Sequence, residues 1–242
     1  YNLQIEKYES IKFVILPYPN LELNNVKVNF NTSSIKVNIK NFKIHPKLLS
    51  IYNYEKFETN KIVLKNSDIS TDVSDINFFI KKILNYKNKK IINNLNITIK
   101  NKNKSIIKLK NINFSNFGYK KNLVTGEMFE NKFKTKLSND YKNINFKLIN
   151  SGIIFDINYE KEKENIYQGI FKSKILNTNI KLNFILNKNI LNIKNTFLRN
   201  KNISLKNKSI ITFEPFFHIN NKFEIEDKNP KMFKKLNFNK LL

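Results

Sequence analysis

Residues 21–30 read LELNNVKVNF, and residues 35–44 read IKVNIKNFKI. In both stretches apolar residues alternate with Lys, Asn or Glu. The alternation slips once in each, at Asn24-Asn25 in the first stretch and between Ile39 and Phe42 in the second. A period of two residues places successive side chains on opposite faces of a β-strand, whereas a helix requires a period near 3.6. The two stretches therefore predict strands with one apolar and one polar face.

The same alternation continues along the chain, in stretches that recur roughly every 10 to 15 residues and are joined by Asn/Lys-rich segments. Ile and Phe fill the apolar positions, as a half-buried pleated surface prefers. Glycine is scarce, and Asn can replace it where the backbone is left-handed. We therefore expect an all-β protein, mainly an antiparallel meander, that forms an elongated curved sheet or β-groove. The further alternating stretches are residues 95–99, 109–114, 133–137, 144–148, 155–159, 180–184, 203–205 and 223–225.

Two segments depart from this pattern. Residues 46–50 (PKLLS) predict a short helical turn after a strand. Residues 75–90 predict an amphipathic helix, because their apolar residues are spaced three or four apart, with Ser74 or Asp75 as a fair N-cap and lysines toward the C-terminal end. Such a helix either covers one end of the apolar face or lies on a membrane surface. Its apolar residues are Ile76, Phe79, Ile80, Ile83 and Leu84.

The charge balance is strongly basic, with 44 Lys+Arg against 19 Asp+Glu and a formal net charge of +25. An anionic partner would account for this excess, and so would coding bias in an AT-rich genome, since Asn, Lys and Ile dominate evenly. Arg199 is the only arginine, although nucleic-acid readers rely on the bidentate guanidinium. In the alternating stretches Lys and Phe also take opposite parities, so lysines and a base-stacking platform would not share a face. Nucleic acid is therefore the less favoured partner.

The sequence offers no set of residues for catalysis. There is no cysteine, which excludes disulfides and thiolate ligands. His45 and His218 have no partner at ligand spacing, and the four glycines are isolated, so no phosphate-binding loop can form. We expect a protein that is not an enzyme and that uses no metal and no cofactor.

One region resembles a known family. Residues 15–30 (ILPYPNLELNNVKVNF) give an apolar strand, a Pro-x-Pro corner and a two-part alternating strand. A second strand then ends in the turn at residues 46–49, and a third strand at residues 57–64 and a closing strand at residues 66–69 follow. This order resembles the N-terminal region of the AsmA family of bacterial envelope proteins, and residues 190–226 resemble the family's later strands. The chain departs from the family pattern in its few glycines and its short length.

The resemblance implies a lipid-handling protein of the bacterial envelope. Members form an apolar β-groove that shields phospholipid acyl chains, and the family is implicated in lipid transport between membranes and in outer-membrane biogenesis. It also implies a periplasmic location, with anchoring to the inner membrane through a segment that is not present in this chain. On this interpretation residues 1–242 are a single groove region, a fragment of a longer chain, whose partners are phospholipid or a membrane surface and other envelope proteins.

The expected groove lining is the apolar side of the alternating strands. The alternative is a structural or interaction module, a closed β-sandwich or scaffold without ligand, and nucleic-acid binding through lysines is a third hypothesis. The candidate groove residues are Leu21, Leu23, Val26, Val28, Ile35, Val37, Ile39, Ile62, Leu64, Ile97, Ile99, Ile112 and Phe114.

Overall fold

The protein is almost entirely β-structure. The computed structural model describes residues 4–29, 34–48, 50, 58–76, 88–101, 104–201, 203–213 and 218–227. Its strands follow the hydrogen-bonded order β1-β3-β4 and then consecutively to β16, in an open sheet, with β2 also paired to β3. This confirms the prediction of an all-β, mainly antiparallel meander. The chain divides into two compact units, residues 1–134 and residues 135–242.

Unit 1 contains the strands that the opening motif predicts. The corner around Pro17 joins β2 to β3, and β3 pairs antiparallel with β4 over the full alternating stretch. The predicted third strand and closing strand are one continuous strand, β5, so the sequence-based division at residue 65 is wrong. The strands are β1 (Gln4–Lys7), β2 (Ser10–Val14), β3 (Asn20–Asn29), β4 (Lys36–Pro46), β5 (Thr59–Asp72), β6 (Lys89–Asn101), β7 (Lys104–Ser115), β8 (Leu123–Met128) and the first part of β9 (Asn131–Leu137).

The slip in the alternation has a structural cause. Asn residues in the left-handed region interrupt the strands at the slip, with φ 51° at Asn25 and φ 52° at Asn66. The interruption keeps Leu23 and Val26, three positions apart, both buried, with exposed fractions of 3% and 0%. Neighbouring strands slip at matching positions, so the register between β3 and β4 is the same before and after the slip. We expected left-handed Asn in turns, but several lie inside strands: Asn25, Asn66, Asn94, Asn111 and Asn195.

Side-chain hydrogen bonds run across the sheet along this line of slips. Asn41 Nδ2 donates to Asn24 Oδ1 over 3.0 Å, and Asn94 Nδ2 donates to Asn66 Oδ1 over 2.8 Å. The amide groups thus bond to one another where the ladder is interrupted.

One strand pair is parallel. β5 and β6 run in the same direction, with Ile62 opposite Lys90 and Ile69 opposite Ile97. A parallel pair requires a crossover connection rather than a hairpin, and the predicted helix at residues 75–90 lies in this connection. Within it, Val73–Asp75 form a 3-10 turn and residues 77–87 lie outside the described residues. Lys89 and Lys90 belong to β6, so the predicted helix extends too far at its C-terminal end.

The second predicted helical segment is a short turn. Leu48 and Ser50 have 3-10 conformation, and the Ser50 amide donates to the Lys47 carbonyl over 2.9 Å.

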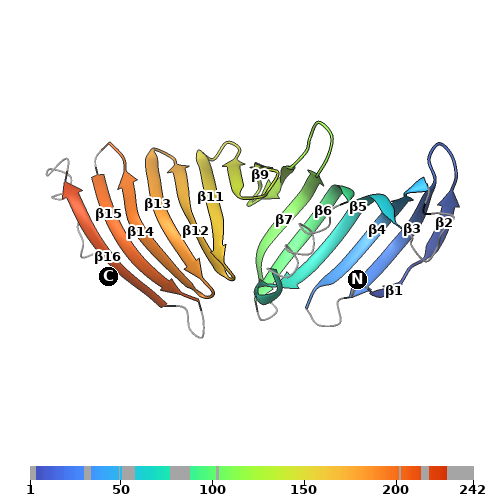
Figure 1. Cartoon of the computed structure of the whole chain (residues 1–242), viewed down its shortest axis with the longest axis horizontal. Helices are drawn as coiled ribbons and strands as arrows, with labels where there is room; N and C mark the ends of the chain where they lie inside the picture. The colour runs from blue at the N-terminus through green and yellow to red at the C-terminus, as the bar shows by residue number, and fades with distance from the viewer. Residues whose placement is uncertain are drawn as a thin grey trace. The chain divides into compact units, whose positions relative to one another are not determined.

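Unit 2 is an antiparallel meander of seven strands that follow the end of β9. Consecutive strands pair directly, and β12 pairs with β13 over ten residues without a register shift. Figure 1 shows the strands of each unit side by side in a single layer. The strands are β10 (Asn143–Leu148), β11 (Ile153–Lys163), β12 (Ile166–Ile175), β13 (Thr178–Asn187), β14 (Ile190–Arg199), β15 (Ile203–Thr212) and β16 (His218–Asp227).

Within each unit, the described strands lie in one sheet, and none packs over the face of another. Within each unit the extensive contacts join hydrogen-bonded neighbours, and the turn at Val73–Asp75 touches β6 only slightly. The closed β-sandwich that the sequence left open as an alternative is therefore not the fold of the described residues.

Candidate functional site

The pairing register collects the apolar residues of unit 1 on one face. Leu23 lies opposite Phe42, and Phe42 lies opposite Leu64. In another row Val28 lies opposite Val37. Directly opposed residues in a sheet share a face, so rows of this kind define what we call the apolar face of unit 1.

All thirteen predicted groove residues lie in these rows or, for Ile35, directly before β4. Eight of them are buried: Leu23, Val26, Val28, Ile35, Val37, Ile39, Ile112 and Phe114. The other five are half-buried: Leu21, Ile62, Leu64, Ile97 and Ile99.

One lysine lies within the apolar face of unit 1. Lys90 is opposite Ile62 in the β5–β6 register and is 2% exposed. Its amide donates to Asn116 Oδ1 over 2.8 Å, and its Nζ lies 6.0 Å from the centroid of the Phe114 ring. Burial lowers the pKa of Lys90 from 10.5 to about 8, because it disfavours the charged form. The sequence placed Lys90 at the end of the predicted helix and so gave no indication of this position.

Unit 2 has a second apolar face, which the sequence-based list omits. Phe155, Phe171 and Leu182 belong to it, because Phe155 lies opposite Ser173 and Phe171 lies opposite both Ile157 and Leu182. The signal was present in the alternating stretches 144–148, 155–159 and 180–184. Its apolar members are Ile144, Phe146, Leu148, Ile153, Phe155, Ile157, Tyr159, Tyr167, Phe171, Ile175, Ile180, Leu182, Phe184, Leu186, Leu191, Ile193, Leu198, Leu205, Ile211, Ile219, Phe223 and Ile225.

The apolar face of unit 2 is more exposed than that of unit 1. Its side chains are mostly half-buried, and Ile175, Phe223 and Ile225 are 40%, 58% and 56% exposed. Aromatic rings pack beside one another on it, with the Phe146 and Phe155 ring centroids 4.5 Å apart and stacked. A contiguous apolar surface of this kind marks an interaction site more often than an ordinary solvent-exposed surface.

Gly169 lets an aromatic ring lie close to the sheet in the middle of this face. A Cβ at Gly169 would come within 2.8 Å of Phe184 Cζ and within 2.3 Å of the Asn158 carbonyl oxygen. The glycine is therefore needed for close packing rather than for backbone freedom.

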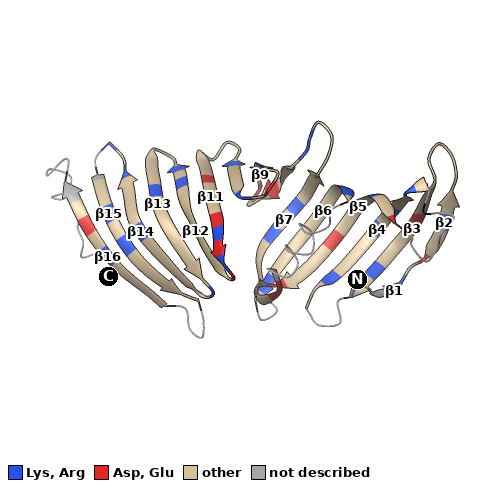
Figure 2. Ribbon diagram, viewed as in Figure 1, with Lys and Arg blue, Asp and Glu red and all other residues tan. Residues whose placement is uncertain are grey.

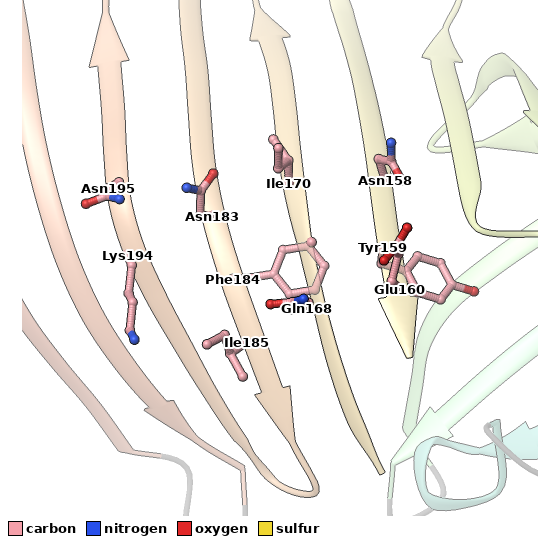
Figure 3. Close-up of a pocket in the computed structure, with 11 residues that line it drawn as sticks. Asn158, Tyr159, Glu160, Gln168, Ile170, Asn183, Phe184, Ile185, Lys194 and Asn195 are labelled. Carbon is pink, nitrogen blue, oxygen red and sulfur yellow. The ribbon is translucent and has the colours of Figure 1, made fainter. Parts of the chain in front are cut away.

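Two shallow hollows of the described surface lie in unit 2, and mainly the polar side of the sheet lines them. One hollow, of about 400 Å³, is bordered by Asn158, Ile170, Asn183 and Lys194 from four consecutive strands (Figure 3). The other, of about 420 Å³, adjoins it and shares Asn158 and Ile170. None of the thirteen predicted groove residues lines either of these two hollows.

The two histidines lie in different units. His45 lies in β4, where burial, Lys61 and Lys43 lower its pKa and Glu22 opposes them. His218 opens β16, on the other unit. In the part of the chain that the structure describes, no group of three or more His, Asp or Glu side chains could hold a metal ion.

Among the described residues, no helix has both the length and the apolar character to cross a membrane. No family model, no curated protein and no solved structure matches this chain.

Proposed function

We propose that this protein is a non-enzymatic lipid-handling protein whose apolar sheet faces shield acyl chains from water. The observation that carries the proposal is the apolar face of unit 2, where seven neighbouring strands expose Ile, Leu and Phe side chains on one side. Phe223 and Ile225 are more than half exposed there.

Burial of apolar surface supports this function. Covering such a face with hydrocarbon gains about 0.8 kcal/mol for each methylene removed from water. An acyl chain is long, apolar and flexible, so it can follow a row of side chains that a β-sheet presents at regular spacing. On the apolar face of unit 1, eight of the thirteen predicted residues are already buried, so only the five half-buried ones would serve the same purpose: Leu21, Ile62, Leu64, Ile97 and Ile99.

The resemblance of residues 15–73 to the AsmA family supports the same function. The Pro corner, the two-part strand β3 and the turn at residues 46–49 follow the order of that family. On this basis we propose a phospholipid ligand, a role in lipid transport or outer-membrane assembly, and a periplasmic location with anchoring to the inner membrane.

A scaffold that binds no lipid is the competing function. It would use the same exposed sheet faces to hold another protein of the envelope. The two functions differ in what occupies the apolar face after gentle purification.

Lipid extraction and native mass spectrometry of the purified protein test the proposal. We expect co-purified phospholipid, and we expect its loss in the double variant Leu182→Asp/Phe184→Asp, which places two carboxylates on the apolar face of β13. The matched control is Asn179→Asp/Asn183→Asp, which adds the same charge to the opposite face of the same strand. Circular dichroism confirms that each variant keeps its β-structure.

The control variant should retain lipid. Equal lipid content in the apolar-face variant and the wild type would contradict the proposal, and so would a wild-type protein free of lipid.

A further inference from the structure

The four central strands of unit 2 carry no acidic residue. From Asn165 to Phe213 the sequence contains no Asp or Glu, although it contains eight lysines and Arg199. Glu164 and Glu214 bracket this segment, which comprises β12 to β15. Figure 2 shows basic positions across these strands, with acidic positions on the flanking strands β11 and β16.

The register places these basic residues together on the polar face. Lys172 lies opposite Lys181, and Lys181 lies opposite Phe197. The members of this surface, which we call the basic face, are all exposed: Lys172, Lys174, Lys181, Lys194, Arg199, Lys206 and Lys208.

Lysines oppose one another directly at two positions. Lys172 faces Lys181, and Lys208 faces Lys222 on β16. Directly opposed like charges destabilise an antiparallel pair, so the arrangement costs folding free energy that an anionic partner would recover.

Apolar side chains project from the same face among the lysines. Phe197 is 40% exposed between Lys181 and Lys206, and Ile210 is 48% exposed. Ile170 and Ile190 are also exposed on this side, at 39% and 42%. Because a strand alternates its side chains, these residues lie on the face opposite the apolar face described above.

We propose that the basic face of unit 2 docks on the anionic surface of a lipid bilayer. Each lysine near such a surface contributes attraction to the headgroups, and apolar side chains between lysines reach the boundary between headgroups and acyl chains. Four strands spaced about 4.8 Å apart present these groups over a width of about 14 Å.

Bilayer and nucleic acid make different demands on a basic surface. Nucleic-acid recognition favours arginine and several stacking aromatics, whereas this face has one arginine and one aromatic residue, Phe197. The docking proposal does not depend on lipid binding at the apolar face, because it uses the opposite side of the sheet.

Vesicle co-sedimentation tests the docking surface. We expect the intact chain to bind vesicles of phosphatidylcholine mixed with phosphatidylglycerol, and not vesicles of phosphatidylcholine alone. Binding should fall as salt is raised, because the attraction is screened. The triple variant Lys174→Gln/Lys181→Gln/Lys208→Gln should lose about 100-fold in vesicle affinity.

The matched control removes three exposed lysines from unit 1: Lys27→Gln/Lys36→Gln/Lys108→Gln. Both variants lower the net charge equally, so the control should bind vesicles much as the wild type does. Phe197→Ser should weaken the binding that remains at high salt.

Three results would overturn the proposal. They are an equal loss of binding in both triple variants, binding of the wild type that ignores phosphatidylglycerol, and tighter binding to duplex DNA than to anionic vesicles. Lipid extraction from the same preparations measures lipid held on the apolar face independently of vesicle binding. The lipid-handling proposal and the docking proposal can therefore be refuted separately.

Discussion

Lys90 provides a quantitative test of how the apolar face of unit 1 is built. Its side chain is 2% exposed and lies opposite Ile62, where the neighbouring rows are apolar. A pKa lowered from 10.5 to about 8 corresponds to a cost of about 3 kcal/mol for keeping the charge in place at neutral pH, at 1.36 kcal/mol per pH unit. Lys90→Met keeps the length of the side chain and removes the charge. We expect the free energy of unfolding at pH 7 to rise by about 1–3 kcal/mol.

The pH dependence gives a second readout of the same residue. Because the pKa is lower in the folded state, the unfolded chain binds more protons between pH 8 and 10.5. Stability therefore rises with pH through this range, and the wild type should gain about 2 kcal/mol between pH 7.5 and 9.5. Urea unfolding followed by circular dichroism at several pH values measures both effects. In Lys90→Met the rise should disappear, whereas in the control Lys89→Met, which changes the exposed neighbour on the other face, it should persist.

A loss of stability in Lys90→Met at pH 7 would refute this reasoning. It would mean that the ammonium group makes contacts whose free energy exceeds the cost of burying it. A pH profile that is the same in Lys90→Met and the wild type would refute the assignment of the rise to Lys90.

Three further changes probe the sheet. Asn94→Ala should destabilise the protein by about 1–2 kcal/mol in urea unfolding, because Asn94 has φ 56° and donates to Asn66 Oδ1 over 2.8 Å, whereas Asn94→Gly keeps the backbone and should lose less. Gly169→Ala should cost about 2–3 kcal/mol, since its Cβ would overlap the Asn158 carbonyl oxygen and the Phe184 ring; a neutral effect would show that the β11 backbone and the ring both move aside freely. His45 has a lowered pKa, first through burial and then through two lysines, so stability should fall as the pH drops below 6.5. His45→Gln should remove this fall in stability below pH 6.5, and an unchanged dependence of stability on pH would show that another group causes it.

The alternation predicted the fold because a two-residue period has only one structural interpretation over many stretches. It failed where the local pattern was mixed. β12 (Ile166–Ile175) reads IYQGIFKSKI, in which apolar residues occur as adjacent pairs, and Gly169 leaves a gap that Phe184 fills from the next strand. That compensation is a tertiary contact, so the sequence of β12 alone does not contain it.

The slips were visible in the sequence but their alignment was not. Asn24-Asn25 reads as a local irregularity, and only the pairing of β3 with β4 shows that both strands slip at the same level. The parallel pairing of β5 and β6 was missed for the same reason, because strand direction depends on the connection and not on the strand's own pattern. The prediction that lysines and aromatic residues lie on opposite faces is correct for Phe171 and Lys172. It is wrong for Phe197, because the left-handed Asn195 shifts the alternation and places Phe197 on the face that carries the lysines.

Photo-crosslinking along β13 (Thr178–Asn187) tests the central claim most directly. A photoreactive amino acid is placed in turn at each position from Ile180 to Leu186, and crosslinked phospholipid is identified by mass spectrometry. In the purified protein, with no vesicles present, lipid held on the apolar face predicts crosslinks at the even-numbered positions, including Leu182 and Phe184, and none at the odd-numbered positions between them. Crosslinks of equal strength at all positions, or no lipid at any position, would contradict the account.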